Sequence, residues 1–490
     1  MVLSAQQYIM LIMNTESLHP LCQTVLSFID EHSFADRQII IAYSGGVDSQ
    51  VLIHILSTLS RKKLINNPVK AIHVHHGLSP NADAWAEFTK SQAENWSVDY
   101  ISARVILKKA KQTSIEALAR DARYQELEKL SNTDAVIVTG HHLDDQLETM
   151  LLALKRGSGV QGLASMQAWR NFRDSRTLAR PLLSVDQQQI IEYAQHHKLQ
   201  WVEDESNNDQ YYDRNFLRNS IISKLKARWP QLPEMAGRTS QHLQESQVLL
   251  DELAEQDINK AIIVDSGFTE KSHPIGNQVL SIETLKQLSD ARVKNAIRFY
   301  LKSLQLLMPS TKQLEQIIQL IHAGQDKTPN VQLADRVIRR YKDGLFITKT
   351  FADVSDFQQQ IQLAELNQQT FISLPDQLGQ ISLQILGQSN KNDELLSGNS
   401  STVFLELNEQ QAINISFAHN NPSLRPEYRD KARPLKKILQ ELHIPTWQRK
   451  RIPFVSFDND FVAALSLFVC KGYVAKDKSK CLAITWHQNR

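Results

Sequence analysis

A glycine turn that carries hydroxyl groups and a carboxylate is suited to a phosphate and a metal ion. It occupies residues 44–49 and follows the apolar run 38–43, which predicts a strand buried on both faces. Glycines allow a tight turn whose N–H groups surround a phosphate, and the helix that follows adds its positive end. The turn lacks the lysine of a Walker loop, and Asp48 offers the carboxylate that Mg²⁺ uses beside phosphates. A glycine turn alone is often structural, but the whole hexapeptide at a strand–helix junction favours function. The expected nucleotide-binding residues are Ser44, Gly45, Gly46, Val47, Asp48 and Ser49, with Asp48 also catalytic and metal-binding.

A second cluster combines acids and histidines at the start of a predicted helix, residues 140–149. It follows a buried strand, and doubly wound sheets bind their ligands at the carboxyl ends of strands. Asp145 and Glu148 are three residues apart, so both carboxylates can face one pocket. Acids in a first turn also cap helices, but three acids and two histidines within eight residues exceed that need. We expect Asp145 and Glu148 to be catalytic and, with His141, to bind a cationic substrate or Mg²⁺.

Two pairs of arginines and one polar loop supply further candidates. Arg120 and Arg123 lie on neighbouring faces of one helical turn, and they either reach a triphosphate or belong to a solvated, salt-bridged face. The loop 203–208 follows an apparent strand at 199–202, and its polar side chains can contact base edges. A solvated loop with a helix cap is the alternative. The substrate-binding candidates in this part are Asp204, Ser206, Asn207 and Arg214, with Arg218 one turn further on.

The elements that would position these side chains alternate between strands and helices. Apolar runs at 38–43, 70–75 and 135–139 predict buried strands, and apolar residues at helical spacing follow them. A capping-box spacing at Thr113 and Glu116 opens the helix that carries the first pair of arginines. Three histidines end the second strand and are expected to line the nucleotide cleft rather than to bind a metal. The alternation predicts an α/β fold with a doubly wound parallel sheet.

Length and composition limit the class of protein. At 490 residues the chain allows two to four domains, and a net charge of +2 means that any RNA surface must be local. Three cysteines exclude a disulfide framework and a cysteine-based zinc site. No apolar run approaches the ~20 residues of a membrane helix, so we expect a cytoplasmic protein without membrane contact. The predicted parts are a disordered leader at 1–19, a catalytic domain at 20–225, a mainly helical substrate-binding domain at 226–349, a linker at 350–401 and a small α+β C-terminal domain at 402–490.

The motifs, taken in order, resemble those of one family within the N-type ATP pyrophosphatases, which cleave ATP between the α- and β-phosphates. The turn is common to that superfamily, whereas Asp-Asp-x-x-Glu at 144–148 and Glu-Asp-x-Ser-Asn at 203–207 are similar to the tRNA(Ile)-lysidine synthetases. The resemblance covers most of 38–222. It implies that the chain uses ATP and Mg²⁺ to join L-lysine to C2 of the wobble cytidine in the CAU anticodon of isoleucine tRNA. The route would be an adenylated cytidine, with release of pyrophosphate and AMP, and carboxylates matching Asp145 and Glu148 would hold the lysine.

The C-terminal part contains a concentration of positive charge. Residues 425–451 include nine Lys and Arg residues and three acidic residues. A solvated charged face is the usual explanation, but phosphate binding accounts better for such a run on a nearly neutral chain. Lys436 and Lys437 lie on a predicted helix at 433–443, and we expect them to bind the tRNA.

Two other functions stay open on the sequence alone. A sulfur transferase of the same superfamily would need catalytic cysteines or a cluster, and the catalytic half has only Cys22, before the first strand. A non-catalytic nucleotide- or RNA-binding protein would have little need of the carboxylates beside an intact phosphate turn. The oligomeric state is also open, with a homodimer as one option.

Overall fold

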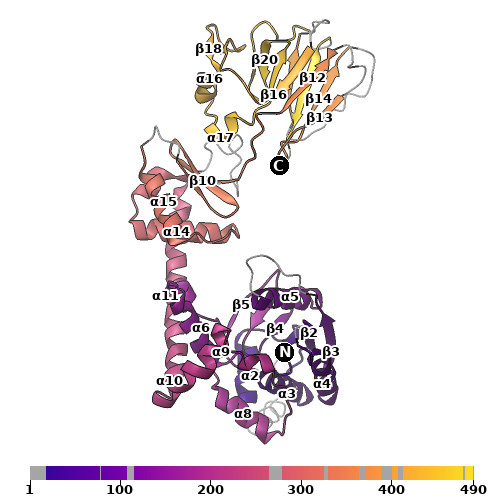
Figure 1. Ribbon diagram of the computed structural model, residues 1–490, viewed down its shortest axis with the longest axis vertical. Coiled ribbons are helices and arrows are strands. Elements are labelled where there is room, and N and C mark those ends of the chain that lie inside the picture. Colours follow the sequence, from indigo (N-terminus) through magenta and orange to yellow (C-terminus); the bar gives the residue numbers. More distant parts are fainter. Residues whose placement is uncertain are drawn as a thin grey trace, which may run out of the picture. The chain divides into compact units, whose positions relative to one another are not determined.

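The chain forms two compact units. The computed structural model describes residues 18–77, 79–106, 115–263, 279–324, 329–363, 366, 370–387, 400–406, 412–477 and 480–488. The units divide between Leu249 and Leu250, within the long helix α11 (Leu232–Ala261) (Figure 1). The predicted leader at 1–19 lies outside the described residues except for Leu18 and His19.

Unit 1 is built on a six-stranded sheet with the strand order β3-β2-β1-β4-β6-β5. All neighbouring pairs are parallel except the last, in which β5 is antiparallel to β6. The chain moves outward from β1 to β3 and then returns to β4, so the predicted doubly wound α/β fold is confirmed. The strands are β1 (Ile39–Ala42), β2 (Val69–His75), β3 (Asp99–Arg104), β4 (Val136–Val138), β5 (Trp169–Asn171) and β6 (Thr177–Ala179).

Alternate residues of the central strand β1 enter two separate cores. Ile39 and Ile41 pack with α2, α3 and α8, whereas Ile40 packs on the other face with Leu127 of α5. A strand covered on both faces needs apolar side chains at every position, which explains the run of three isoleucines. Figure 1 shows α2 and α3 on one side of the sheet and α5 on the other. The helices of unit 1 are α2 (Pro20–Glu31), α3 (Val47–Arg61), α4 (Ala82–Asn95), α5 (Ile115–Lys129), α6 (Leu143–Lys155), α7 (Val160–Leu163), α8 (Gln187–His196), α9 (Asp213–Phe216) and α10 (Ser223–Arg228).

In three places, unit 1 differs from what the sequence predicts or the prediction lies outside the described residues. The edge strand β3 escapes the sequence analysis because its residues are only half covered and include polar ones. The strand predicted at 199–202 is wrong: the segment is irregular, and the N–H of Val202 donates to the carbonyl of Gly45 at 3.0 Å. It fastens the glycine turn instead of extending the sheet. The capping box at Thr113 and Glu116 lies outside what the structure describes.

Unit 2 begins with helices packed on an antiparallel sheet. The helices of this part are α13 (Ile282–Lys286), α14 (Asp290–Ser303) and α15 (Thr311–His322), in keeping with the helical content that the sequence predicts. A five-stranded sheet in the order β7-β8-β11-β10-β9 accompanies them, so "mainly helical" understates the strand content of 226–349. Its strands are β7 (Ile262–Ile263), β8 (Val279–Ser281), β9 (Asn330–Gln332), β10 (Arg336–Tyr341) and β11 (Gly344–Lys349).

The rest of unit 2 contains two antiparallel sheets with the orders β12-β16-β19-β20-β21 and β13-β14-β22-β15, and a short β17-β18 pair. The predicted linker at 350–401 is wrong, because β12 pairs with β16 and β14 pairs with β22. In β12, for example, only Ile361 is buried and the glutamines on either side are exposed, so the segment is polar in sequence although it forms a strand. The elements are β12 (Gln358–Gln362), β13 (Thr370–Ser373), β14 (Gln380–Ile385), β15 (Ser400–Leu405), β16 (Ala412–Ser416), β17 (Ser423–Leu424), β18 (Arg433–Pro434), α16 (Leu435–Glu441), α17 (Thr446–Arg449), β19 (Phe454–Phe457), β20 (Asp460–Ala464), β21 (Phe468–Val469) and β22 (Leu482–His487).

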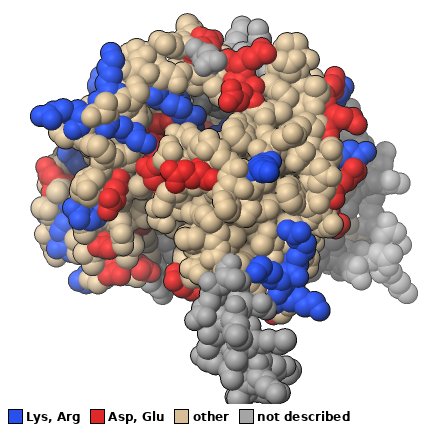
Figure 2. All heavy atoms as spheres, turned by 90° about the horizontal axis from the view of Figure 1, so that it is seen from below, with Lys and Arg blue, Asp and Glu red and all other residues tan. Residues whose placement is uncertain are grey.

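One face of the molecule carries side chains of both charges. Figure 2 shows small groups of Lys and Arg and of Asp and Glu around a broad area that bears neither. This agrees with a net charge near zero and places no continuous basic surface on that face. Among the described residues, no helix is long and apolar enough to cross a membrane.

Candidate active site

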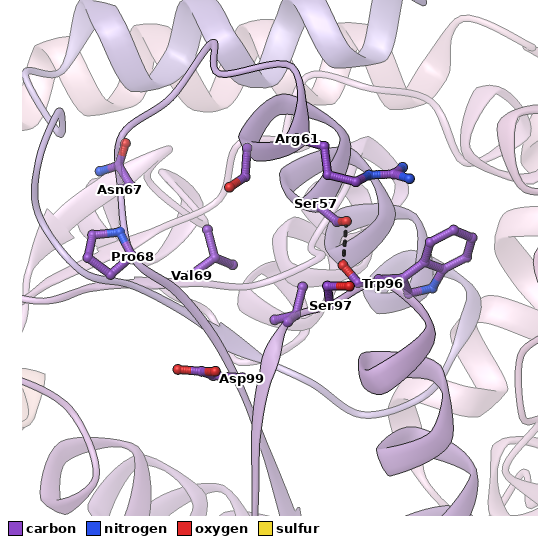
Figure 3. Close-up of a pocket in the computed structure, with 10 residues that line it drawn as sticks. Ser57, Arg61, Asn67, Pro68, Val69, Trp96, Ser97 and Asp99 are labelled. Carbon is purple, nitrogen blue, oxygen red and sulfur yellow. Dashed lines mark hydrogen bonds between the residues drawn. The ribbon is translucent and has the colours of Figure 1, made fainter.

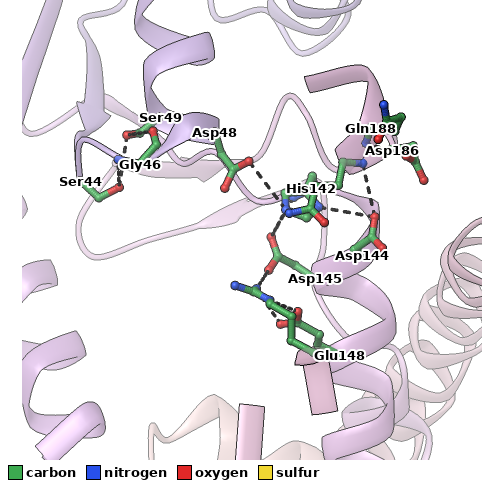
Figure 4. Close-up of polar contacts among 12 residues, drawn as sticks. Ser44, Gly46, Asp48, Ser49, His142, Asp144, Asp145, Glu148, Asp186 and Gln188 are labelled. Atoms are coloured by element: carbon green, nitrogen blue, oxygen red, sulfur yellow. Dashed lines mark hydrogen bonds and ion pairs between the residues drawn. The ribbon is translucent and has the colours of Figure 1, made fainter. Parts of the chain in front are cut away.

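The glycine turn connects β1 to α3 at the carboxyl end of the sheet. The hydroxyl of Ser49 accepts the N–H of Gly45 at 3.0 Å and donates to the carbonyl of Gly46 at 2.9 Å (Figure 4). Gly45 has a φ of +89°, and a Cβ there would lie 2.8 Å from Thr89 Cγ2, so only glycine fits. Gly46 is the N-cap of α3 and has no side chain to cap the first N–H groups. The turn and the helix end therefore form a site for an anion.

Asp48 lies in the first turn of α3, against the residue that follows β4. A Cβ on Gly140 would lie 2.9 Å from Asp48 Cβ, so this glycine makes room for the aspartate. Asp48 Oδ1 is buried and accepts no hydrogen bond within the described chain. Burial raises the pKa of Asp48, while nearby His142 opposes the rise. A buried carboxylate oxygen without a donor suits a cation, and Mg²⁺ needs only one or two such ligands when phosphates supply the rest.

His142 lies among three carboxylates and links the glycine turn to the acidic helix (Figure 4). It is the buried N-cap of α6, with Nε2 at 3.8 Å from Asp48 Oδ1 and 3.6 Å from Asp145 Oδ2. Its Nδ1 is 3.9 Å from Asp144 Oδ2, and its backbone N–H donates to Asp145 Oδ2 at 3.0 Å. The sequence alone predicts no individual role for His142. A histidine three positions before an aspartate at a helix start is the signal that could have found it.

Asp145 and Glu148 face one pocket, as their spacing predicts, and a guanidinium group connects them. Arg218 donates from Nε to Glu148 Oε1 at 2.5 Å and from Nη2 to Glu148 Oε2 at 3.0 Å and Asp145 Oδ1 at 3.1 Å. Arg214 Nε is 3.2 Å from Glu148 Oε2. Glu148 is only 1 % exposed, and a carboxylate so buried requires a cation. The pocket is therefore built to hold a positive group between two acids.

The two carboxyl groups differ in how readily they take a proton. Burial alone would raise the pKa of Asp145, but His142, His141 and Arg218 outweigh it and hold the pKa below its usual value. Burial raises the pKa of Glu148 above its usual value despite the hydrogen bonds from Arg218. Asp145 therefore stays ionised more readily, and Glu148 is the better proton acceptor of the pair.

Arginines and histidines surround the same end of the sheet. Burial, with a smaller contribution from the charge of Arg120, lowers the pKa of His141 to about 4, and Nδ1 of this ring is 2.7 Å from Thr139 Oγ1. Burial, aided by the charge of Arg123, lowers the pKa of His76 to about 4. The two arginines on α5 therefore lie close enough to the carboxyl ends of β2 and β4 for their charges to act there. Triphosphate binding by them stays a prediction.

The polar loop lies beside the glycine turn, to which Val202 attaches it. The N–H of Asn207 donates to the carbonyl of Asp204 at 2.9 Å, and the carbonyl of Asn207 accepts from Asn219 Nδ2 at 3.0 Å. The side chain of Ser206 is outside the described part. Base contacts by these residues stay a prediction, as does the phosphate role of Arg214, which here contacts a carboxylate.

The basic run 425–451 is partly neutralised by acids of its own domain. Arg429 and Arg433 both pair with Glu441, and Arg451 Nη1 is 2.7 Å from Asp376 Oδ2. The exposed Lys436 and Lys437 on α16 take part in none of the ion pairs of the described chain. Contact of these two lysines with the tRNA stays a prediction.

A cavity of about 240 Å³ in unit 1 lies at the opposite end of the sheet from these groups. It is lined by the starts of β2 and β3 and the end of α3, where Ser57 Oγ donates to the carbonyl of Trp96 at 2.8 Å (Figure 3). No candidate catalytic residue lines it. Its place at the amino ends of the strands is also the wrong end for a doubly wound fold.

Three family models match separate parts of the chain. A family model described as a PP-loop domain matches residues 18–225. Models described as the TilS substrate binding domain and the TilS substrate C-terminal domain match residues 280–346 and 413–486. The turn, the acidic helix and the polar loop all fall within the first match.

Individual relatives extend this likeness over nearly the whole chain. A tRNA(Ile)-lysidine synthase of Actinobacillus pleuropneumoniae serotype 3 is 38% identical over 444 residues, covering 89% of this chain and 96% of the relative. One from Haemophilus influenzae strain PittEE is 38% identical over 432 residues, covering 88% and 94%. Among solved structures, the U34-tRNA thiolase NcsA of Methanococcus maripaludis with its [4Fe-4S] cluster covers 46% of this chain and 78% of its own, with 17% identity and a TM-score of 0.38, too low to carry an argument.

Proposed function

The chain belongs to the tRNA(Ile)-lysidine synthase family, and we propose on that basis how its residues divide the reaction of that family. The enzyme is an ATP-dependent carbon–nitrogen ligase that joins lysine to C2 of the wobble cytidine of isoleucine tRNA. The observation that supports this assignment of residues to steps is the buried pair Asp145 and Glu148. His142 lies between this pair and the carboxylate of Asp48 in the glycine turn. This arrangement supports the assignment of a cation pocket next to a phosphate site.

The first step activates the base. The cytidine O2 attacks the α-phosphate of ATP, and the bond to pyrophosphate breaks while the base becomes adenylated. The N–H groups of residues 44–49 and the start of α3 hold the departing phosphates, because that end of the helix is uncapped and positive. Asp48 would hold Mg²⁺ through its unpartnered Oδ1, and the ion would neutralise charge on the phosphates. Arg120 and Arg123 would add positive charge near His141 and His76.

The second step uses the acid pair. The ε-amine of lysine attacks C2 of the adenylated base, the C2–O2 bond breaks, and AMP leaves with that oxygen. Asp145 and Glu148 already bind the cation of Arg218, and we assign the same two carboxylates to attract the ammonium group of the incoming lysine. The amine must lose a proton before it attacks, since its ordinary pKa is ~10.4. Glu148 is the residue assigned to take it, because burial makes it the better base of the pair.

The other parts of the chain would bind the tRNA. The loop at 203–208 lies beside the glycine turn and is assigned to the cytidine and its neighbours in the CAU anticodon. Lys436 and Lys437 are assigned to phosphates elsewhere on the tRNA, because they are exposed and unpaired within the described chain. ATP, lysine and tRNA meet in the cytoplasm, which is where we place the protein.

Sulfur transfer is not favoured as an alternative. Cys22 lies on α2, buried against Tyr193, and burial raises the pKa of its thiol, so it is a poor nucleophile. The other two cysteines are buried in unit 2. None is placed at the glycine turn.

Mass spectrometry of the wobble nucleoside tests the proposal. The protein would be incubated with ATP, lysine and an isoleucine tRNA that carries a CAU anticodon, and the tRNA would then be digested. We expect lysidine in the digest with wild-type protein and none with Asp48→Asn. Omission of lysine should leave AMP attached to the tRNA. Unmodified cytidine with all three substrates present would overturn the proposal.

A further inference from the structure

A second cavity of about 240 Å³ lies in unit 2, where α17 meets the sheet β7–β11. It is lined by Asn330, Arg339, Arg340, Thr446, Trp447 and Lys450, together with Pro329. No carboxylate is among these residues. Its volume is below the ~300 Å³ at which pockets for drug-sized ligands begin, so it suits a fragment such as one phosphate and part of its sugar.

Arg339 is the central cation of this cavity. Its Nε donates to Thr348 Oγ1 at 2.9 Å, and its guanidinium stacks 5.5 Å from the ring of Trp447 and 5.6 Å from that of Phe351. Arg339 makes none of the ion pairs found in the described chain, and burial lowers its pKa. A half-buried guanidinium without an anion is costly, so its exposed edge is suited to an acceptor from outside.

The neighbouring arginines do not share this property. Arg340 points to the other face of the strand, where its Nη1 donates to the carbonyls of Leu320 and Ile321 at the end of α15. Arg429, Arg433 and Arg451 each have a carboxylate partner. Arg339 differs from these arginines in that its guanidinium donates to a hydroxyl group, and not to a carboxylate or to carbonyl groups.

The other walls of the cavity suit a nucleotide. Lys450 is exposed at the end of α17. Its charge acts on the carboxylate of Asp353, and Asp353 does not line the cavity. Trp447 packs edge-on against Phe346 at 5.3 Å, which holds the indole in place. The indole N–H is buried and has no acceptor in the described chain. A phosphate oxygen would satisfy the cations, and the adjoining sugar or base would meet an aromatic surface.

We propose that this cavity binds one phosphodiester of the tRNA backbone, with Arg339 and Lys450 as its ligands and Trp447 as the wall beside the sugar. The inference rests on the proposed function only in taking tRNA as the substrate. It assigns a definite RNA contact to the junction of the two substrate domains, which the basic run alone does not do. Phosphate contacts fix the position of an RNA without reading its sequence, so the cavity would serve affinity rather than the choice of tRNA.

The salt dependence of tRNA binding by the full-length protein tests this inference. Each lost phosphate contact should lower the slope of log Kd against log salt by ~0.7–0.9. Between 50 and 200 mM salt, the ratio of wild-type to Lys450→Gln affinity should therefore change roughly threefold. Lys476→Gln is the matched control, because Lys476 is an exposed lysine of the same domain that lies outside the run 425–451 and does not line the cavity. Its slope should equal that of the wild type.

Arg339 provides a second, independent variant. Arg339→Lys should keep most of the slope because it keeps the charge, whereas Arg339→Gln should lose as much as Lys450→Gln. An unchanged slope in both Gln variants, or an equal loss in Lys476→Gln, would overturn the inference. If inorganic phosphate quenches Trp447 fluorescence (identified by its loss in Trp447→Phe) but the tRNA slopes do not change, the cavity binds free phosphate and the RNA assignment is wrong.

The result of this test can be distinguished from the result of the test of the proposed function. Lysidine formation is measured with the wild-type protein, and the salt slopes are measured with the variants. Failure of wild-type protein to form lysidine, with the predicted slopes intact, would refute the catalytic proposal and leave the RNA cavity standing. Normal lysidine formation with unchanged slopes would refute only the cavity.

Discussion

Replacement of Glu148 by glutamine should raise the KM for lysine strongly while leaving adenylation of the tRNA largely intact. Glu148 is 1 % exposed and meets two guanidinium groups, so its pocket stabilises a cation by charged hydrogen bonds rather than by solvent. Losing one charged hydrogen bond in such a site costs about 1.5–3 kcal/mol, which corresponds to roughly a ten- to hundredfold rise in KM.

Asp144 supplies the matched control for this variant. It lies on the same helical turn and is as buried as Asp145, but its Oδ1 binds Lys226 at 2.5 Å and its Oδ2 accepts the N–H of Gln187. Asp144→Asn should therefore lower stability without changing the KM for lysine. Because Glu148→Gln also leaves Arg218 without a full partner, some loss of stability is expected there as well.

Two assays separate the outcomes. Release of pyrophosphate in the absence of lysine reports adenylation, and lysine titration of lysidine formation reports KM. The assignment would be refuted if Glu148→Gln lost adenylation and kept its lysine KM, because the carboxylate would then serve the metal or the phosphates. Equal KM values for the Glu148 and Asp144 variants would show that the effect comes from burial in general.

Other variants test the remaining parts of the site. Asp48→Asn should reduce formation of pyrophosphate and AMP by orders of magnitude at nearly unchanged tRNA affinity, and undiminished turnover would remove Asp48 from phosphate or metal handling. Gly45→Ala should weaken ATP binding and cost about 1–2 kcal/mol of stability, because its φ is +89° and the new Cβ would meet Thr89 Cγ2 at 2.8 Å, which ATP titration and thermal melts would measure. Lys436→Gln with Lys437→Gln should lower the salt slope of tRNA binding by ~1.4–1.8, and an unchanged slope would return them to a solvated face. Burial lowers the pKa of His54 to about 4 from 6.5, so the folded state disfavours its charged form, and stability is lost as pH falls below 6.5; hydrogen exchange of α3 should show a loss of about 2 kcal/mol from pH 7 to pH 5, which His54→Gln should abolish.

The fold of unit 1 and the proximity of several candidate site residues are predictable, because the sequence signals for them are local. Ile39 to Ile41 are apolar since both faces are covered, and the glycine turn must follow such a strand to bind a phosphate. The spacing of Asp145 and Glu148 places them in one pocket by helical geometry alone. In each case the information lies within a few consecutive residues.

The parts that escape prediction depend on contacts distant in the chain. Arg218 reaches Glu148 across 70 residues, and no local pattern shows that a guanidinium connects the two acids. The strands in 350–401 have polar outer faces, so their burial becomes visible only once β16 and β22 pair with them. The cavity at Arg339 joins residues more than a hundred positions apart, and the absence of a carboxylate from its lining is apparent only in the structure.

The fate of the cytidine oxygen tests the central claim most directly. A tRNA carrying ¹⁸O at O2 of its wobble cytidine would be incubated with the protein, ATP and lysine, and the AMP released would be analysed by mass spectrometry. If O2 attacks the α-phosphate and lysine then breaks the C2–O2 bond, one ¹⁸O atom must appear in AMP for each lysidine formed. Unlabelled AMP together with lysidine would contradict the account.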